Sequence, residues 1–449
     1  MNILHYALGF PPYRTGGLTK FCMDLMHQQV EEGHKVSLLW PGEMRLFHND
    51  TSIKYHGKNG TIHSFEVINP TPVSYDEGIT QIDTFTQAGN ELAYKSFLQK
   101  LRPDAIHIHT LMGMHRSLLV AAKKLNIRIV FSAHDFFPIC PKVTMFRNGR
   151  TCPNIENCEC CAQCNTTALS LNQIRLLQSG LYRTVKDSYF VKKLRKQHRD
   201  NYLSETVVKQ SRQVETGLNA KDYLRLRDWH RSLVEMADVI HYNSSVTKAV
   251  YEKYLQPVGP KDVLIPITHA DIQDHRQKKT FDHDIRITYL GPAGGAKGYF
   301  LLRKALDQLW NDKINGRQDF CLNIYFQPTD PAPYMKVHGR YTYEQLESIF
   351  ANTDILVAPS IWYETFGYTV LEALSFGVPV IISDTVGAKD IIPEGAGIVV
   401  EDITTEKLAK YIVQLDTEQL QYMNKVVTES FTIPTLAFMC KEILKKCYP

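Results

Sequence analysis

The chain has 449 residues, and its 44% hydrophobic and 22% charged content is that of an ordinary globular protein. That length exceeds what one hydrophobic core usually organises, so we expect two domains. The formal net charge of +4 is too small to indicate a nucleic-acid partner, and no run approaches the roughly 18 apolar residues of a membrane-spanning helix. Residues 1–12 carry no charged leader before an apolar stretch, so we expect a cytoplasmic protein rather than a secreted one.

In the first part of the chain, short apolar runs alternate with stretches of helical periodicity. Residues 2–7 and 35–39 have the pattern of strands, and the apolar residues between 18 and 32 recur at helical spacing. The same alternation returns between residues 105 and 131, where two strands flank a helix. Because strand, helix and strand alternate, we expect an α/β fold with a parallel sheet covered by helices.

Residues 165–235 interrupt this alternation with a long basic stretch of mostly helical period. Its cations are densest at 192–196, and aromatic residues lie among them, namely Tyr182, Tyr189, Phe190 and Tyr202. A solvated helical face and an oligomer interface are two interpretations of this insertion. The third is contact with an anionic membrane or a lipid-diphosphate acceptor, which would place the protein at the inner face of the membrane.

A second alternating block begins at residue 285 and continues to residue 400. Residues 256–260, with two prolines and a glycine, have the composition of a linker, so the sequence predicts a domain boundary there. The predicted parts are residues 1–258, residues 259–432 and a last helix at 433–449.

The most informative segment runs from Pro359 to Pro379, where a strand leads through a loop into a helix expected to begin near Gly367. Backbone N–H groups at a helix start favour anions, and a glycine there lets the backbone approach a phosphate closely. Glu364 lies in the loop, and Glu372 lies about one turn inside the helix. Their carboxylates suit the hydroxyl groups at the two ends of a nucleotide sugar.

This segment resembles the Glu-x7-Glu motif of retaining glycosyltransferases of family 4, which have the GT-B fold of two facing Rossmann-like domains. The residues before it, Pro359-Ser360, and after it, 377–380, match the family as well. The resemblance implies that Glu364 contacts the donor sugar and that Glu372 holds the ribose. The donor-binding residues that it implies are Gly16, Gly17, Gly291, Lys297, Glu364, Thr365, Phe366, Gly367, Tyr368 and Glu372.

The resemblance also gives each predicted part a role. Residues 1–258 would form the acceptor-side Rossmann-like domain, with a cysteine-rich loop at 140–164 and the helical basic insertion at 165–235. Residues 259–432 would bind the nucleotide sugar, and the helix at 433–449 would pack back on the first domain.

The segment from Tyr289 to Gly298 joins a predicted strand to a predicted helix. It lacks the Gly-Lys-Ser/Thr of a P-loop and the glycine spacing of a dinucleotide fingerprint. Lys297 suits a diphosphate as a point charge, and a solvated loop lysine is the alternative. The family usually has Gly-Arg at this strand end, whereas here Pro292 follows Gly291. One expected cation is therefore missing, and Lys297 or another cation must supply that charge.

Strand ends in the first half supply the other candidates. Gly16 and Gly17 follow the first strand, where the family places its loop against the donor phosphates and the acceptor. His134 resembles the family histidine beside the transferring sugar, and His107 and His109 stand where the family often has His-x-His. The alternative for a strand-end histidine is a hydrogen-bonded structural residue.

The resemblance implies a reaction that retains anomeric configuration, with His134, Glu364 and Lys297 as the catalytic residues. The leaving diphosphate would help to take the acceptor's proton, so no protein nucleophile is expected. The resemblance also implies that no catalytic metal or other catalytic cofactor is needed. Assembly of a cell-surface glycan is the family tendency. A sugar phosphorylase, a nucleotide-sugar epimerase and a weakly catalytic GT-B-like subunit of a partner transferase are the alternatives. The donor, the acceptor and the linkage stay open.

Six of the ten cysteines lie between residues 140 and 164. The spacing Cys161-x2-Cys164 is typical of a tetrahedral thiolate corner, and Cys140 and Cys152 would complete a structural zinc site. Cys158 and Cys160 are alternative ligands. Free thiols, an iron–sulfur cluster and disulfides are the other interpretations.

Overall fold

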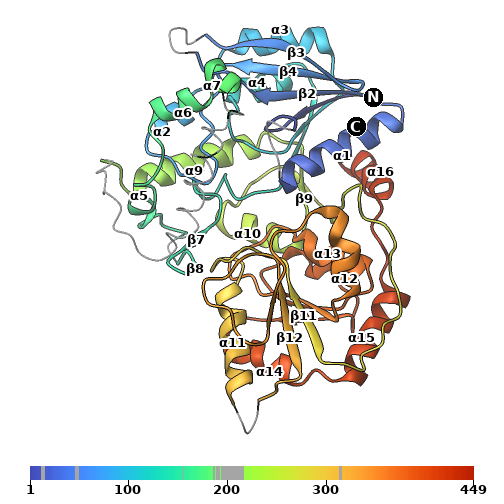
Figure 1. Cartoon of the computed structure of the whole chain (residues 1–449). Helices are drawn as coiled ribbons and strands as arrows, with labels where there is room; N and C mark the ends of the chain where they lie inside the picture. The colour runs from blue at the N-terminus through green and yellow to red at the C-terminus, as the bar shows by residue number, and fades with distance from the viewer. Residues whose placement is uncertain are drawn as a thin grey trace. The chain divides into compact units, whose positions relative to one another are not determined.

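The structure is a computed structural model that describes residues 1–11, 16–45, 50–153, 155–185, 188, 193, 217–312 and 316–449. The chain divides into two compact units. The first consists of residues 1–147, 152–269 and 436–449, and the second of residues 148–151 and 270–435. Each unit is built around one sheet covered by helices (Figure 1).

The first unit contains an eight-stranded sheet of order β10-β9-β6-β5-β1-β2-β4-β3. Every neighbouring pair is parallel except β3 and β4. The chain runs outward from β1 in one direction and from β5 in the other, so the strand order reverses between β1 and β5. The strands are β1 (Asn2–Tyr6), β2 (Lys35–Pro41), β3 (Ser52–Asn59), β4 (Ile62–Ile68), β5 (Ala105–Ile108), β6 (Arg128–Ala133), β9 (Val239–Tyr242) and β10 (Lys261–Leu264).

Helices α1, α3, α4, α9, α10 and α16 are the longer helices of this unit, and local sequence explains where several begin. Ser244 caps α10, because its side chain accepts a hydrogen bond from the Thr247 N–H at 3.1 Å. α16 contacts α1, as Figure 1 shows near the two chain ends. The helices are α1 (Gly17–Glu31), α2 (Ile82–Phe85), α3 (Glu91–Leu101), α4 (Arg116–Lys124), α5 (Cys161–Cys164), α6 (Leu171–Leu177), α7 (Gly180–Val185), α9 (Ala220–Val234), α10 (Ser245–Tyr254) and α16 (Leu436–Cys447), and β7 (Phe146–Arg147) pairs with β8 (Arg150–Thr151).

The predicted basic insertion is described only in part. Its ends form α6, α7 and α9, where Ser170 and Asn219 each close a capping box. The densest basic run, 192–196, lies outside the described residues except for Lys193, as do Tyr189, Phe190 and Tyr202. Contact with a membrane therefore stays a prediction. In the described part of the chain, no helix has the length and apolar character to cross a membrane.

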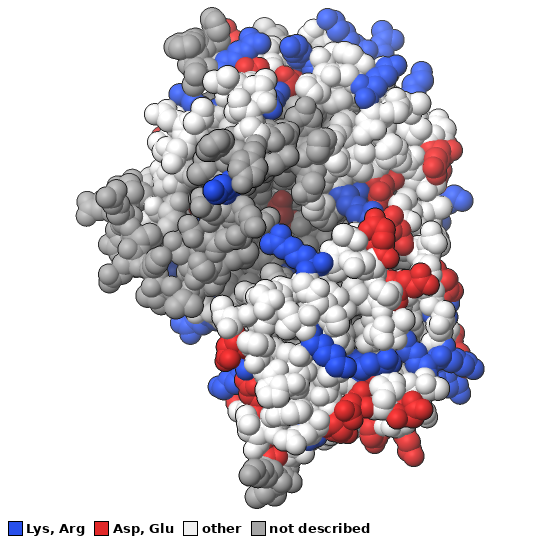
Figure 2. Space-filling model, in the orientation of Figure 1, with Lys and Arg blue, Asp and Glu red and all other residues white. Residues whose placement is uncertain are grey.

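The second unit contains a six-stranded, wholly parallel sheet of order β13-β12-β11-β14-β15-β16. Here the strand order reverses between β11 and β14, and in Figure 1 α11 and α14 cover one face of the sheet. The elements are β11 (Ile285–Tyr289), α11 (Tyr299–Asn311), β12 (Phe320–Ile324), β13 (Met335–Val337), η1 (Tyr343–Gln345), α12 (Leu346–Ala351), β14 (Ile355–Ala358), α13 (Tyr368–Ser375), β15 (Val380–Ser383), η2 (Gly387–Ile391), β16 (Gly397–Val400), α14 (Thr405–Val413) and α15 (Thr417–Ser430). Acidic and basic side chains lie side by side over the visible face of this unit (Figure 2).

The first unit extends further than the sequence predicts. Residues 256–260 connect α10 to β10, and β10 pairs with β9 in the first sheet. The unit therefore continues to His269, beyond the boundary predicted at residue 258. Proline and glycine mark a turn within a domain in the same way as they mark a linker between domains, so composition does not separate the two.

Candidate functional site

The loops after β11 and β14 lie at the point where the strand order of the second sheet reverses. In open parallel sheets, ligands bind beyond the carboxyl ends of the strands at such a switch point. The loop after β11 contains Gly291 and Lys297, and the loop after β14 contains Glu364. Topology thus brings together two segments that the sequence identifies separately.

Backbone contacts hold these two loops against each other. The Ala296 carbonyl accepts hydrogen bonds from the N–H groups of Ile361, at 2.9 Å, and Trp362, at 3.3 Å. Gly298 has a φ of 77°, and a Cβ there would lie 1.8 Å from the Pro359 carbonyl oxygen. Because only glycine tolerates that backbone conformation and that approach, Gly298 is what allows the loops to close together.

Lys297 and Glu364 form an ion pair between the two loops. The other carboxylate oxygen of Glu364 accepts a hydrogen bond from the Ser360 hydroxyl at 2.8 Å. The Lys297 ammonium also lies 5.4 Å from the centre of the Trp362 ring, within the range of a cation–π contact. Trp362 has a buried indole N–H that finds no hydrogen-bond partner among the described residues. Ser360 and Trp362 are not identifiable as site residues from the sequence, because only the fold shows what they contact.

The backbone around Glu364 continues into the start of α13. Glu364 pairs with Val386 in an isolated parallel bridge, and the Phe366 carbonyl accepts a hydrogen bond from the Ala388 N–H at 2.7 Å. Gly367, with a φ of 104°, is the N-cap of α13, which begins at Tyr368. The first N–H groups of a helix have no partner within the helix, so Thr365, Phe366, Gly367 and Tyr368 surround a helix start that favours an anion.

Glu372 lies farther along α13 and is only 4% exposed. The Tyr343 hydroxyl forms a hydrogen bond with it, and Tyr341 lies close enough to feel its charge. Burial, reinforced by the Glu372 carboxylate, raises the pKa of Tyr341 to about 12 and that of Tyr343 further. Tyr325 stacks on His338 with ring centroids 5.0 Å apart and meets Tyr341 edge-on. An aromatic group therefore adjoins the second glutamate of the motif.

In the first unit, the glycines and histidines predicted from the sequence occupy different places. Gly16 is the N-cap of α1, with a φ of 113°, and Gly17 is the first residue of that helix. A Cβ on Gly16 would meet no atom within 4 Å, so its backbone conformation rather than a close approach requires glycine. His134 follows β6, and its ring lies 4.5 Å from that of Phe21 in α1, measured between centroids.

His107 and His109 belong to a larger buried group than the sequence indicates. Strand register places His5 opposite His107, and Ser132 opposite His241. The rings of His107 and His109 stack with centroids 4.1 Å apart. Desolvation lowers the pKa values of His5 and His241 to about 4 and those of the other two histidines well below the ordinary range.

Three of these histidines, His5, His107 and His109, are the one group in the described part of the chain whose ligand atoms are close enough for a metal ion. Both ring nitrogens of each already form hydrogen bonds, to Gln29, Tyr448, Ser132, His134 or each other. A metal would have to displace those bonds, and the buried group carries no negative charge to compensate the ion. The residues therefore fit a neutral hydrogen-bonded network better than a metal centre.

The cysteine-rich loop brings the four predicted thiols, those of Cys140, Cys152, Cys161 and Cys164, close enough for their charges to act on one another. Cys158 forms a hydrogen bond with Cys161 and accepts another from the Arg227 guanidinium at 3.0 Å. The contact with Cys161, which outweighs the effect of burial, lowers the pKa of Cys158 to about 7. No three of the described cysteine sulfurs lie within 4.8 Å of one another. A bound metal would have to draw at least three of these sulfurs closer together, so structural zinc stays a prediction. Cys158 and Cys161 remain an alternative pair of ligands.

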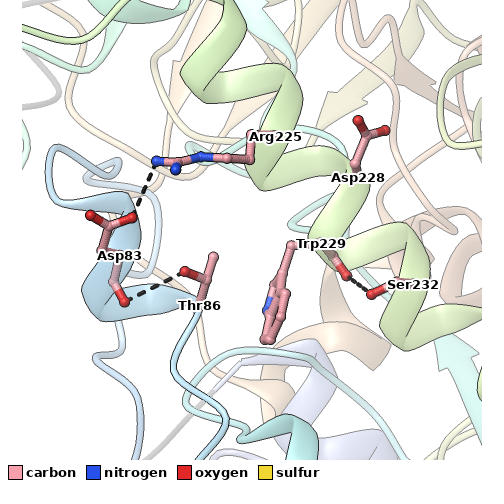
Figure 3. Close-up of a pocket in the computed structure, with 6 residues that line it drawn as sticks. All are labelled: Asp83, Thr86, Arg225, Asp228, Trp229 and Ser232. Atoms are coloured by element: carbon pink, nitrogen blue, oxygen red, sulfur yellow. Dashed lines mark hydrogen bonds and ion pairs between the residues drawn. The ribbon is translucent and has the colours of Figure 1, made fainter.

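A hollow of about 340 Å³ lies elsewhere on the first unit, between α2 and α9. Figure 3 shows Arg225 reaching toward Asp83, with an N–O distance of 3.1 Å, and Trp229 forming one wall. The six residues that line it are Asp83, Thr86, Arg225, Asp228, Trp229 and Ser232. It contains none of the residues predicted for the site.

Two family models match the chain, one in each unit. The model described as Glycosyltransferase Family 4 matches residues 15–153, and the model described as Glycosyl transferases group 1 matches residues 271–427.

Curated relatives are similar over shorter segments. An uncharacterised 42.6 kDa protein of the cps region of Klebsiella pneumoniae is 22% identical over 153 residues, which are 33% of this chain and 40% of that protein. A GDP-mannose-dependent monoacylated α-(1-6)-phosphatidylinositol monomannoside mannosyltransferase of Corynebacterium glutamicum is 31% identical over 93 residues, which are 19% of this chain and 24% of that enzyme. The match thus spans 40% or less of the length of these relatives.

Solved structures are similar over nearly the whole chain. Sucrose-phosphate synthase from Thermosynechococcus elongatus superimposes with a TM-score of 0.56 at 15% identity, covering 99% of this chain and 98% of that one. Anabaena Alr3699/HepE in complex with UDP gives a TM-score of 0.52 at 13% identity, covering 99% of both chains. These likenesses show the fold, and the predicted α/β architecture of two Rossmann-like units of the GT-B type is confirmed.

Proposed function

We propose that this chain, which has the GT-B fold and matches a glycosyltransferase family in each of its units, transfers a sugar from a nucleotide diphosphate to an acceptor. One observation carries the proposal. The Lys297–Glu364 ion pair lies at the switch point of the second sheet, beside the start of α13, and the buried Glu372 lies about one turn inside that helix.

Each part of this arrangement suits one part of a nucleotide sugar. Lys297 and the N–H groups at the start of α13 offer positive charge for the diphosphate. Glu364, held by Ser360, offers a carboxylate to sugar hydroxyls. Glu372 offers one to the ribose, and the neighbouring Tyr325–His338–Tyr341 group gives the base an aromatic surface.

The ion pair implies a change on binding. An incoming diphosphate would compete with Glu364 for the Lys297 ammonium. The donor would draw the ammonium toward its phosphates and free one oxygen of Glu364 for the sugar. Pro292 removes the cation that the family usually has here. Lys297 therefore has the larger share in stabilising the leaving diphosphate.

The finer parts of the proposal are supported by resemblance. The resemblance of the Glu364–Glu372 segment to the family motif implies retention of configuration without a catalytic metal, and His134 would lie beside the transferred sugar. Assembly of a surface glycan is supported by the relative from the cps region of Klebsiella pneumoniae and by the mannosyltransferase of Corynebacterium glutamicum. The latter is named for GDP-mannose, whereas Alr3699/HepE was solved with UDP, so both bases belong in the test.

The test is thermal unfolding of the full chain with UDP-, GDP-, ADP- and dTDP-sugars, followed by assay of nucleotide release. A donor that binds only the folded state raises the unfolding midpoint. We expect one base to do so, and Glu372→Gln to abolish the shift. Glu347→Gln, which changes an exposed glutamate on α12, is the matched control. Binding without sugar transfer to any acceptor would favour the alternative of a supporting subunit, and no shift with any donor would contradict the proposal.

A further inference from the structure

The buried histidines of the first unit form part of a continuous line of hydrogen bonds. One end of the line fixes which group donates and which accepts in every bond along it. The Ile265 carbonyl can only accept, so His241, 2.8 Å away, must donate from Nε2. A neutral His241 then accepts at Nδ1 from the Ser132 hydroxyl at 2.7 Å. Ser132 in turn accepts from His107 Nε2 at 2.6 Å, which leaves His107 Nδ1 to accept from the Tyr448 hydroxyl at 2.7 Å.

The same direction continues on the other side of Tyr448. Its oxygen accepts from the Gln29 amide at 3.1 Å, and Gln29 Oε1 accepts from His5 Nε2 at 2.7 Å. His5 Nδ1 therefore accepts from His109 Nε2 at 2.9 Å. His109 Nδ1 accepts from His134 Nε2 at 3.3 Å, where the line ends. Each donor and each acceptor is used once, so reversing any link would place two donors or two acceptors opposite each other.

We propose that this line of hydrogen bonds sets His134 in the Nε2–H tautomer and leaves its Nδ1 to accept a hydrogen bond from a substrate hydroxyl, with Tyr448 and Gln29 as positioning residues. The part concerning the substrate rests on the function proposed above. The part concerning the tautomer rests on the first unit alone, because all the residues of the line belong to that unit.

Burial supports the neutral state that the line requires. His5, Gln29, His107, His109 and His241 are fully buried, whereas His134 is partly exposed. Desolvation lowers the pKa of all five histidines of the line and raises that of the Tyr448 hydroxyl, so the rings stay neutral and the hydroxyl keeps its proton near pH 7.

Tyr448→Phe is the variant that breaks the direction while keeping the packed ring. Without the tyrosine oxygen, the Gln29 amide group loses its acceptor and is free to rotate. It then offers N–H to His5, and the run through His109 to His134 can reverse. Tyr6→Phe is the matched control, because it removes a buried tyrosine hydroxyl that donates to the Met112 carbonyl at 3.1 Å outside the line.

The experiment is two-bond ¹H–¹⁵N NMR of the full chain labelled in its histidine rings, with His134 assigned from the His134→Asn spectrum. We expect His134 as the single Nε2–H tautomer in the unaltered chain and in Tyr6→Phe, and signals of the Nδ1–H tautomer in Tyr448→Phe. Gln29→Met breaks the line one step nearer to His134 and should have the same effect if Tyr448→Phe folds poorly. A mixed His134 in the unaltered chain, or an unchanged spectrum in both variants, would overturn the proposal.

Two further readouts separate the possible failures. Once a donor has been identified, Tyr448→Phe should lower kcat about 2- to 10-fold, which corresponds to the loss of one hydrogen bond. The KM for the donor should change little. If Tyr448→Phe changes the His134 tautomer but leaves kcat unchanged, the proposed role of His134 toward substrate is refuted. The proposed transferase activity would stand. Zinc that binds the full chain and shifts the signals of His5, His107 and His109 would overturn the hydrogen-bonded line in favour of a metal site.

Discussion

The side chains of Lys297 and Glu364 meet although 67 residues separate them in the sequence. Each is recognisable by itself, Lys297 from a glycine-rich loop and Glu364 from its spacing to Glu372. Their pairing, and the support from Ser360 and Trp362, depends on two loops that meet only when β11 and β14 become neighbours. The sequence therefore predicts that Lys297 and Glu364 are charged site residues, but not that they form an ion pair.

Removing the Lys297 charge tests its share in diphosphate binding. We expect Lys297→Met to weaken binding of the nucleoside diphosphate about 10-fold or more, because a charge-assisted hydrogen bond is lost and Glu364 then repels the phosphates. Titration calorimetry gives the affinity, and Lys304→Met, an exposed lysine on α11, is the control. Equal affinities in the two variants would show that another cation holds the diphosphate.

At the scale of elements, periodicity locates the strands expected at 2–7 and 35–39, which are β1 at Asn2–Tyr6 and β2 at Lys35–Pro41. The helix expected between residues 18 and 32 is α1 at Gly17–Glu31, and the second alternating block, expected to begin at residue 285, opens with β11 at Ile285–Tyr289. The edge strands are less visible. β10 is a four-residue strand with one buried side chain, so it lacks the apolar run that marks the inner strands. The histidines of β1, β5 and β9 look like isolated polar residues until strand register aligns them.

Gly298 tests how closely the two site loops must approach. We expect Gly298→Ala to destabilise the second unit by about 1–3 kcal/mol, because a Cβ would collide with the Pro359 carbonyl and the backbone has a positive φ. Urea unfolding measures the loss, and nucleotide binding should fall with it. Gly294→Ala on the same loop is the matched control, since a Cβ there meets nothing within 4 Å. A loss of equal size in both variants would refute the close-approach argument.

At the scale of the whole molecule, the buried histidines make stability depend on pH. Their folded-state pKa values lie below the unfolded value of 6.5, so the unfolded chain binds more protons as the pH falls. The free energy of folding that His5 and His241 contribute is fully present above pH 6.5. It is lost progressively as the pH falls to about 4, where these two residues protonate in the fold. Asp135 acts in the opposite direction, because burial raises its pKa to about 6 and its neutral form favours the fold at low pH.

We therefore expect the free energy of unfolding to fall between pH 6.5 and pH 5. Each buried histidine contributes a slope of up to about 1.4 kcal/mol per pH unit. The opposing Asp135 carboxyl does not offset the five histidines of the hydrogen-bonded line together with His115 and His230, whose pKa values burial also lowers to about 4. Denaturant titrations at a series of pH values measure the slope. A free energy that stays level or rises over this interval would show that the histidines are already charged in the fold.

The first unit joins residues from distant parts of the chain, because Tyr448 and α16 complete a network that begins at His5 in β1. During synthesis, β1 leaves the ribosome long before Tyr448 exists. Until then Gln29 and His107 lack the Tyr448 hydroxyl group that joins them in the complete fold. The second unit, whose segments at 148–151 and 270–435 both precede α16, has all of its described strands synthesised by then. The first unit therefore becomes complete only after the second, although most of its residues are synthesised earlier.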